Sequence, residues 1–113
     1  MALQFYGLKT CDSCRAALKA LETAGLRIET RDVREDGVPE ELLRQALERH
    51  GADRLVNRRS TTWRGLDETA RAGDPVDLIR AYPTLMKRPL IVSPDGAVII
   101  GWDADARSSL NLT

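Results

Sequence analysis

Apolar positions alternate with polar ones near both ends of the chain and recur with a helical period between them. Residues 3–6 are short, aromatic and partly alternating, and Gly7 follows, so they predict a strand. Residues 12–24 carry one stripe of alanines and leucines before Gly25, which predicts a helix. Residues 27–33 alternate weakly and fit a second strand. This order predicts a βαβ unit with a right-handed crossover.

The middle of the chain has a different pattern, dominated by helical periods. A predicted helix opens at Pro39 and Glu40 and runs to about Arg49, with leucines on one face. Residues 53–73 show no clean period and predict loop with short helix.

A further helix is predicted from Asp74 to about Tyr82. Asp74 can cap it, and Pro75 suits its first turn. We therefore expect residues 38–84 to form a helical subdomain, inserted into a single domain that spans residues 1–113.

Two apolar runs return near the C-terminus, at residues 89–92 and 97–101. The Ser-Pro-Asp-Gly turn of residues 93–96 separates them, which predicts a β-hairpin. Residues 103–110 predict a short closing helix. The order βαβ, helical insert, ββα predicts an α/β protein with a thioredoxin-like fold.

Charge and composition narrow the function classes. Lysine plus arginine equals aspartate plus glutamate, at 17 each, which argues against a nucleic-acid binder driven by bulk charge. No apolar run approaches the roughly 18–20 residues of a membrane span, and no secretory signal is visible. We expect a cytoplasmic monomer without direct nucleic-acid or membrane contacts. In that compartment, closely spaced cysteines are more often redox-active, catalytic or metal-binding than structural.

Cys11 and Cys14 stand where the first predicted strand gives way to the first predicted helix. Backbone N–H groups at a helix start lack intrahelical partners, and the helix dipole favours negative charge there. A thiolate is therefore stabilised at Cys11, and the thiolate is the nucleophilic form. Cys14 lies one turn further, so the two sulfurs can share a face. We expect Cys11 to attack a disulfide and Cys14 to resolve the product.

The residues alone leave other roles open. Free cysteines are often buried packing residues, which is the alternative for this pair. A zinc site needs about four ligands, and Cys11, Cys14 and His50 are too few, so no metal is expected. His50 precedes Gly51 at a predicted helix end, where a cation complements the dipole. Asp12 opposes thiolate formation if its carboxylate points towards the sulfur.

Two basic clusters interrupt the balanced charge. One comprises Arg58 and Arg59 with Arg64 nearby, and the other is the Lys-Arg-Pro segment of residues 87–89. Arginine binds carboxylates and oxyanions through paired hydrogen bonds, and it lowers the pKa of a neighbouring thiol. Either role would support chemistry at Cys11 if the fold brings these segments close to it. The alternative is that these arginines are solvated charges on the surface.

The bond between Arg88 and Pro89 precedes an apolar run at the position where thioredoxin-like folds place a cis-proline beside the active cysteine. Proline is the residue for which a cis bond costs little. A cis bond here turns the backbone of Arg88 towards the thiol. Trp63 and Trp102 are expected to pack in the core rather than to contact a ligand.

Four segments carry a family signature: YGLKTCDSCR at 6–15, DVREDG at 32–37, NRRSTTWR at 57–64 and YPTLMKRP at 82–89. In this order they resemble the arsenate reductase (ArsC)/Spx family, and within it the YffB-type branch. The match runs over about residues 3–110. The resemblance implies a thioredoxin-like fold with a helical insert, in agreement with the hydrophobic pattern.

The resemblance also implies roles for single residues. Cys11 matches the redox cysteine of the family, and Thr10 precedes it as a substrate-binding residue. Arg88 matches the arginine before the cis-proline, here Pro89, which helps to hold an oxyanion or a thiol ligand. Arg59 is the better match for a second, middle arginine.

Three features qualify the resemblance. Arg58 lies one residue from Arg59 and is the alternative middle arginine. Family arsenate reductases use a third arginine in the last hairpin, whereas residues 95–102 hold no basic residue, which counts against arsenate reduction. Those enzymes typically have one cysteine in the motif. Cys14 makes this motif resemble the disulfide switch of Spx regulators, which bind RNA polymerase.

Together, the residues and the resemblance favour a thiol-dependent oxidoreductase without a bound cofactor. Glutathione is the expected co-substrate, and glutaredoxin or thioredoxin the expected protein partner. The alternatives are a glutaredoxin-coupled arsenate reductase and an Spx-like redox sensor that binds RNA polymerase.

Overall fold

The computed structural model describes residues 2–110. Its strands are β1 (Leu3–Gly7), β2 (Ile28–Asp32), β3 (Leu90–Val92) and β4 (Val98–Ile100). The helices near the two ends of the chain are α1 (Asp12–Thr23) and α7 (Ala104–Ser109). The helices between β2 and β3 are α2 (Glu40–His50), α3 (Ala52–Leu55), α4 (Thr61–Arg64), α5 (Glu68–Arg71), α6 (Pro75–Ala81) and the 3-10 helix η1 (Pro83–Leu85). We refer to the segment from α2 to η1 as the helical insert.

The strands form one sheet in the order β2-β1-β3-β4. β1 pairs with β2 in parallel and with β3 antiparallel, and β4 pairs antiparallel with β3. The βαβ unit and the C-terminal hairpin that the pattern predicted are therefore confirmed. The mixed α/β architecture is that of a thioredoxin-like fold, as expected.

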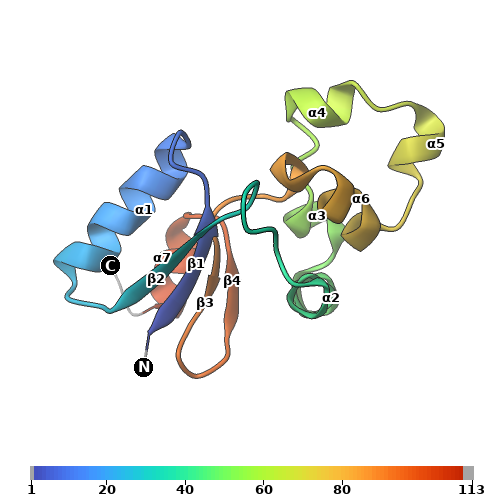
Figure 1. Cartoon of the computed structure of the whole chain (residues 1–113). Coiled ribbons are helices and arrows are strands. Elements are labelled where there is room, and N and C mark those ends of the chain that lie inside the picture. Colours follow the sequence, from blue (N-terminus) through green and yellow to red (C-terminus); the bar gives the residue numbers. More distant parts are fainter. Residues whose placement is uncertain (1, 111–113) are drawn as a thin grey trace.

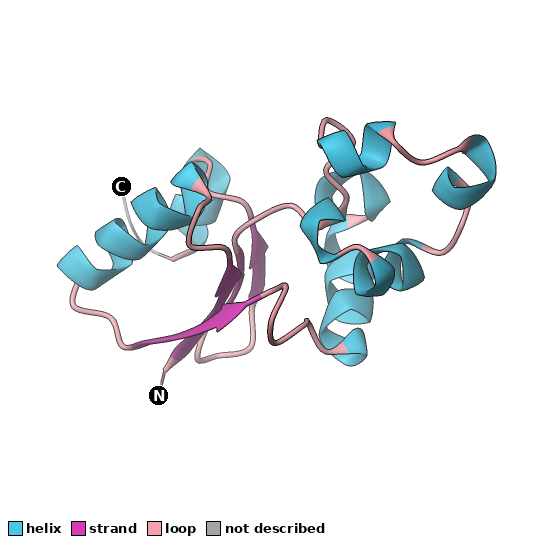
Figure 2. Cartoon of the chain, turned by 45° about the horizontal axis from the view of Figure 1, so that its top comes forward, coloured by secondary structure: helices cyan, strands magenta, loops and turns pink. Residues whose placement is uncertain are grey.

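Helices cover both faces of the sheet. Figure 1 and Figure 2 show α1 and α7 on one side and the helical insert on the other. Successive side chains of a strand point to opposite faces, so Phe5 packs in the cluster under α1 while Tyr6 packs in the cluster under the insert. Ile99 and Ile100 of β4 divide in the same way. Each large apolar side chain buried in these two cores contributes about 1.5–3 kcal/mol.

Residues 53–73 contain more helix than their pattern indicated. The short helices α4 and α5 each begin at a side-chain cap, which a hydrophobic period cannot reveal. The Ser60 hydroxyl accepts a hydrogen bond from the N–H of Trp63, and the Asp67 carboxylate accepts one from Ala70. These caps satisfy N–H groups that lack intrahelical partners, so single turns are held in a polar stretch.

The predicted cap of α6 is wrong in one detail. The helix starts at Pro75 as expected, but the side chain of Asp74 makes no cap hydrogen bond. Its carboxylate instead accepts a hydrogen bond from Arg44 of α2, at 3.4 Å. A contact between distant segments has replaced the local one.

The tryptophan predictions agree with the packing, whereas His50 contacts a strand instead of capping its own helix. Trp63 is half-buried against the core under the insert, and Trp102 against the core under α1. His50 ends α2, and its Nε2 lies 2.7 Å from the carbonyl oxygen of Val98, so it joins the insert to the edge of β4.

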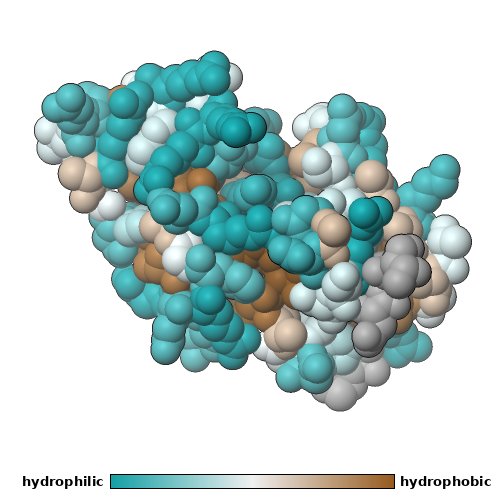
Figure 3. All heavy atoms as spheres, turned by 180° about the vertical axis from the view of Figure 1, so that it is seen from behind, coloured by the Kyte–Doolittle hydropathy of each residue, from teal (hydrophilic) through white to brown (hydrophobic). Residues whose placement is uncertain are grey.

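The outer surface is largely hydrophilic. On the face shown in Figure 3, apolar residues are visible mainly in recesses between polar side chains. Over the described part of the chain, every helix is too short or too polar to span a bilayer.

Candidate functional site

Cys11 occupies the boundary between the β1–α1 turn and α1. It is the N-cap residue of the helix, with an extended backbone at φ −89° and ψ 121°. Its N–H donates to the carbonyl of Leu8 at 3.2 Å, and its carbonyl accepts from the N–H of Arg15 at 3.0 Å. The side chain is half-buried. The sulfur therefore lies at the positive end of the longest helix described, with access to solvent.

Cys14 is buried beneath this turn, with 1% of its surface exposed. The absence of a side chain at Gly7 makes room for it. A Cβ atom at Gly7 would lie 2.8 Å from Cys14 Sγ and 2.9 Å from Cε1 of Phe5, which is too close for either pair. The glycine that ends β1 is thus required by the second cysteine, and this close approach is a signal that the sequence analysis missed.

The surroundings of Cys11 stabilise its thiolate. Burial raises the pKa of the Cys11 thiol, but interactions with the backbone N–H and the thiol of Cys14 and with the Arg88 guanidinium outweigh burial and hold the pKa below its ordinary value. The sulfur does not meet the strict geometry of a helix-cap hydrogen bond. The N–H of Cys14 nevertheless stabilises the negative charge electrostatically.

Cys14 has the opposite electrostatics. Burial raises the pKa of the Cys14 thiol to about 12, against a hydrogen bond from the backbone of Leu8 that lowers it. The neighbouring Cys11 sulfur contributes to this raised value, since two thiolates in contact repel each other. Cys11 is therefore the more readily ionised thiol of the pair, and Cys14 is the thiol that keeps its proton.

Arg88 is the arginine that the structure brings to Cys11. It lies directly before β3, and the Arg88–Pro89 peptide bond is cis, as the sequence analysis had considered. One terminal nitrogen of its guanidinium donates to the carbonyl of Thr84 at 3.3 Å. Its Nε is buried and has no acceptor among residues 2–110. A cation with an unused buried donor is thus held beside the thiolate.

Thr10, Pro89 and Asp12, which the sequence analysis also placed near the thiol, differ from Arg88 in their exposure and contacts. Thr10 is exposed in the turn before Cys11, and Pro89 is buried directly before β3. The Asp12 carboxylate forms an ion pair with Arg15 on the exposed side of α1. This ion pair offsets the carboxylate's negative charge, so the repulsion anticipated for Asp12 is weakened.

Arg58 and Arg59 lie on the insert, in the loop that leads to α4. Both are exposed. The Arg58 guanidinium pairs with Asp53 and stacks over Trp63, 5.7 Å from the ring centroid. The backbone N–H of Arg59 donates to the side chain of Asn57, at 3.1 Å. Neither arginine contributes to the lowered pKa of Cys11. Their expected role in substrate binding stays a prediction.

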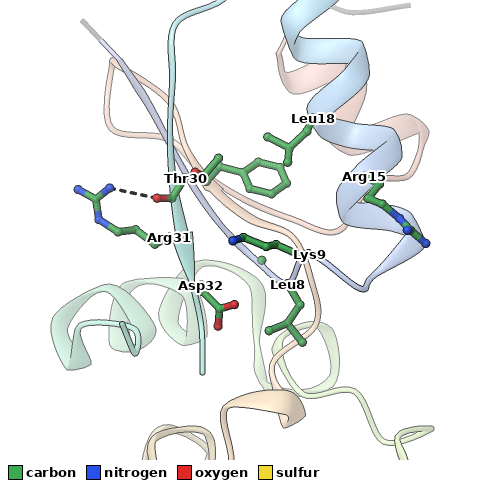
Figure 4. Close-up of a pocket in the computed structure, with 9 residues that line it drawn as sticks. Leu8, Lys9, Arg15, Leu18, Thr30, Arg31 and Asp32 are labelled. Atoms are coloured by element: carbon green, nitrogen blue, oxygen red, sulfur yellow. Dashed lines mark hydrogen bonds between the residues drawn. The ribbon is translucent and has the colours of Figure 1, made fainter. Parts of the chain in front are cut away.

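A separate hollow opens near the same turn, between α1 and β2. It has a volume of about 160 Å³. Figure 4 shows Lys9 crossing it, Leu18 at its inner side, and Arg15 directed away. The guanidinium of Arg31 donates to the carbonyl of Thr30 at 3.2 Å, the dashed line of Figure 4. Neither cysteine lines this hollow. Within residues 2–110, no three histidine, cysteine or acidic side chains gather as a metal site.

Comparison with known proteins yields matches over nearly the whole chain. A model of the ArsC family matches residues 6–109. An uncharacterized protein of Haemophilus influenzae is 40% identical over an alignment of 102 residues that covers 87% of this chain and 89% of that protein. A solved structure of a YffB protein has a TM-score of 0.84 at 28% identity, covering 96% of this chain and 97% of that one. An arsenate reductase (ArsC) related protein from Brucella melitensis has a TM-score of 0.71 at 30% identity, covering 99% and 97%.

Proposed function

The chain belongs to the ArsC family, and on that basis we propose that it is a thiol-dependent reductase of the arsenate reductase type, with Cys11 as its nucleophile. One observation carries the proposal: the Arg88 guanidinium and the Cys14 thiol both act on the Cys11 sulfur and lower its pKa against the effect of burial. A thiol that ionises more readily is the better nucleophile for an attack on a disulfide or an oxyanion.

The first step of the proposed reaction is an exchange at the Cys11 sulfur. The thiolate attacks one sulfur of a substrate disulfide and forms a mixed disulfide, while the other substrate sulfur leaves as a thiolate. Arg88 stabilises the anionic groups at this point. Its buried Nε, which lacks an acceptor among the described residues, is available to donate to a bound anion.

In the second step, Cys14 resolves the mixed disulfide. Once the charge on Cys11 is consumed, the repulsion that raises the pKa of Cys14 disappears, so the buried thiol loses its proton more readily. The Cys14 thiolate then attacks Cys11 Sγ and releases the second substrate thiolate. The substrate gains two electrons, and the protein is left with a Cys11–Cys14 disulfide. Two molecules of glutathione, which we propose as the reductant, restore the dithiol and leave as glutathione disulfide.

Arsenate is the second candidate substrate, favoured by the family and by the arsenate reductase related neighbour. The same dithiol would reduce arsenic acid to arsenious acid, with release of one water and formation of the Cys11–Cys14 disulfide. The structure adds one observation about the missing third arginine. Arg54 reaches the last hairpin from the insert, but one terminal nitrogen of its guanidinium is bound to the carbonyl of Ile100 and to Asp103. This occupancy favours disulfide substrates over arsenate.

A coupled assay tests the proposal and separates the two substrates. Oxidation of NADPH is followed with glutathione and glutathione reductase. A small mixed disulfide is the substrate in one arm, read above the rate without the protein, and arsenate with added glutaredoxin is the substrate in the other. We expect turnover with the disulfide that is lost in Cys11→Ser. Turnover in the arsenate arm but not in the disulfide arm would show that arsenate, and not a disulfide, is the substrate. Turnover that persists in Cys11→Ser would overturn the role of Cys11.

A further inference from the structure

Arg54 links the helical insert to the end of the sheet, away from the cysteines. It belongs to α3, and about a third of its side chain is exposed. One terminal nitrogen of its guanidinium lies 2.8 Å from the carbonyl oxygen of Ile100 and 2.6 Å from Oδ2 of Asp103. One nitrogen therefore serves both the last residue of β4 and the cap of α7.

The backbone of α3 holds the segment that precedes Arg88. The N–H of Lys87 donates to the carbonyl of Leu55 at 2.8 Å. Val56 and Met86 form an isolated antiparallel bridge directly beside this hydrogen bond. The residue before Arg88 is thus fixed to the residue after Arg54.

The end of β4 holds the segment that follows Arg88. The N–H of Gly101 donates to the carbonyl of Pro89 at 2.8 Å, and Ile100 is the strand partner of Leu90. A Cβ atom at Gly101 would lie 3.5 Å from Cε of Lys87 and 3.7 Å from the Arg54 guanidinium. The two supports of Arg88 therefore converge at one point, and Arg54 joins them.

We propose that Arg54 is a positioning residue that sets the reach of Arg88 towards Cys11. The hydrogen bonds of Arg54 complete a closed series of contacts. The series runs from α3 to Lys87, along the chain to Pro89, on to the end of β4, and from there to Arg54 again. Without these hydrogen bonds, the insert and the hairpin can shift relative to each other, and Arg88 lies between them. This inference rests on the proposed function, because it concerns the same thiolate.

The charge of the partner carboxylate supports this role. The N–H of Ala106 and the Arg54 guanidinium hold the pKa of the Asp103 carboxyl below its usual range. Asp103 is therefore ionised at neutral pH and forms a charge-assisted hydrogen bond with Arg54. Both contacts come from one terminal nitrogen at the end of a long planar side chain, so Arg54→Lys keeps the charge but changes the reach and direction of the donor.

A neighbouring arginine supplies the control. Arg49 of α2 also reaches the C-terminal hairpin, but it donates to the carbonyl of Gly96 at 2.9 Å, in the turn at the far end. It lies outside the series of contacts that holds Arg88. Replacing it removes the same charge and a comparable insert-to-hairpin hydrogen bond without touching the segment before β3.

The experiment measures the rate of Cys11 alkylation as a function of pH, resolved by mass spectrometry, in the full chain. Variants are Arg54→Ala, Arg54→Lys, Arg49→Ala, Arg88→Ala and the double variant Arg54→Ala/Arg88→Ala. We expect the midpoint of the Arg54→Ala profile to move up in pH, in the direction of Arg88→Ala, with Arg54→Lys between it and the unsubstituted protein. Arg49→Ala should leave the midpoint unchanged. The double variant should match Arg88→Ala, because the effect of Arg54 passes through Arg88.

The two proposals fail in different ways. If Arg88→Ala moves the midpoint and neither Arg54 variant does, the positioning role is overturned and the thiolate mechanism stands. If Arg88→Ala leaves the midpoint in place, the proposed function itself is contradicted. An additive double variant would assign Arg54 a direct electrostatic effect and overturn positioning through Arg88. Should Arg54→Ala fail to fold, Arg54→Lys decides by the same readout.

Discussion

Two regions of this protein hold arginines in different ways. At the β1–α1 turn, Arg88 acts on the sulfur of Cys11, and its Nε has no acceptor among the described residues. In the loop that leads to α4, Arg58 pairs with Asp53 and stacks over the ring of Trp63. The Arg71 guanidinium also lies over that ring, 5.6 Å from its centroid. The first region keeps a cation available for an anion, whereas the second uses its cation for packing.

The difference shows that a positive cluster in the sequence is not yet a positive site. The segment around Arg58 is richer in arginine than the segment around Arg88. What separates them is the partners that each meets in space: an acidic and an aromatic side chain in one case, and a thiol at a helix start in the other. The predictions below remove one element of this contrast at a time.

Removal of the nucleophile should have the largest effect. Cys11→Ser replaces a thiolate by a hydroxyl that stays protonated at neutral pH, so we expect disulfide reduction to fall by at least about 100-fold. The loop variant Arg58→Ala should keep most of its activity, because the contacts of Arg58 are to Asp53 and Trp63. The coupled NADPH assay measures both. A larger loss in the loop variant than in Cys11→Ser would reverse the contrast.

Filling the space above Cys14 should destabilise the fold. The Cβ of Gly7→Ala would meet Cys14 Sγ at 2.8 Å and Phe5 at 2.9 Å. We expect a loss of about 1–3 kcal/mol in the free energy of unfolding, as for other overpacked cores, measured by urea denaturation.

Gly65→Ala is the matched control for this change. Its Cβ would come no closer than 3.5 Å to the carbonyl of Thr62, in ordinary contact. Its free energy of unfolding should stay close to that of the unsubstituted protein. Equal losses in the two alanine variants would show that the close approach at Cys14 has no special cost.

Neutralising Arg88 should weaken the thiolate without removing it. Without Arg88, only the N–H and the thiol of Cys14 lower the pKa of Cys11 against the effect of burial, so this pKa rises. At pH 7, we expect Arg88→Ala to slow alkylation of Cys11 on the order of three- to tenfold. Arg88→Lys keeps the charge and should retain part of the rate. An unchanged rate in Arg88→Ala would mean that Arg88 stabilises the chain before β3 and does not affect the thiol.

The smallest effect is expected in the insert loop. Arg58→Ala removes one of the two cations over Trp63, which should cost about 0.5–1 kcal/mol of stability and change the tryptophan fluorescence. The exposed ion pair with Asp53 adds little to this. Arg64→Ala is the control, since no ion pair or ring contact of its guanidinium is found among residues 2–110. A slower alkylation of Cys11 in Arg58→Ala would place this loop in the thiol site.

The parts of the fold that depend on local pattern could be predicted from the sequence. The helix from Asp12 and the closing helix capped by Asp103 follow from an apolar stripe or a cap residue, and both are confirmed. The hairpin around Gly96 follows in the same way from its turn residues. The pattern could not predict contacts between residues far apart in the chain. Asp74, for example, pairs with Arg44 instead of capping its own helix.

The candidate site divides along the same line. The position of Cys11 at a helix start is a local property, and the sequence was sufficient for it. The approach of Arg88 depends on the strand order, which the sequence analysis did not state and anticipated only through the place of the cis-proline in thioredoxin-like folds. The engagement of Arg58 by Asp53 and the hydrogen bonds of Arg54 depend on how the insert folds onto the sheet, and no local signal announces either.

The pH dependence of alkylation of both cysteines in the reduced, unsubstituted protein tests the central claim most directly. Because the pKa of Cys11 is lowered and that of Cys14 is raised to about 12, Cys11 should reach half of its maximal rate below the midpoint of the same thiol in the unfolded chain. Cys14 should stay unmodified until far more alkaline pH. A Cys11 midpoint at or above that of the unfolded chain would contradict the account.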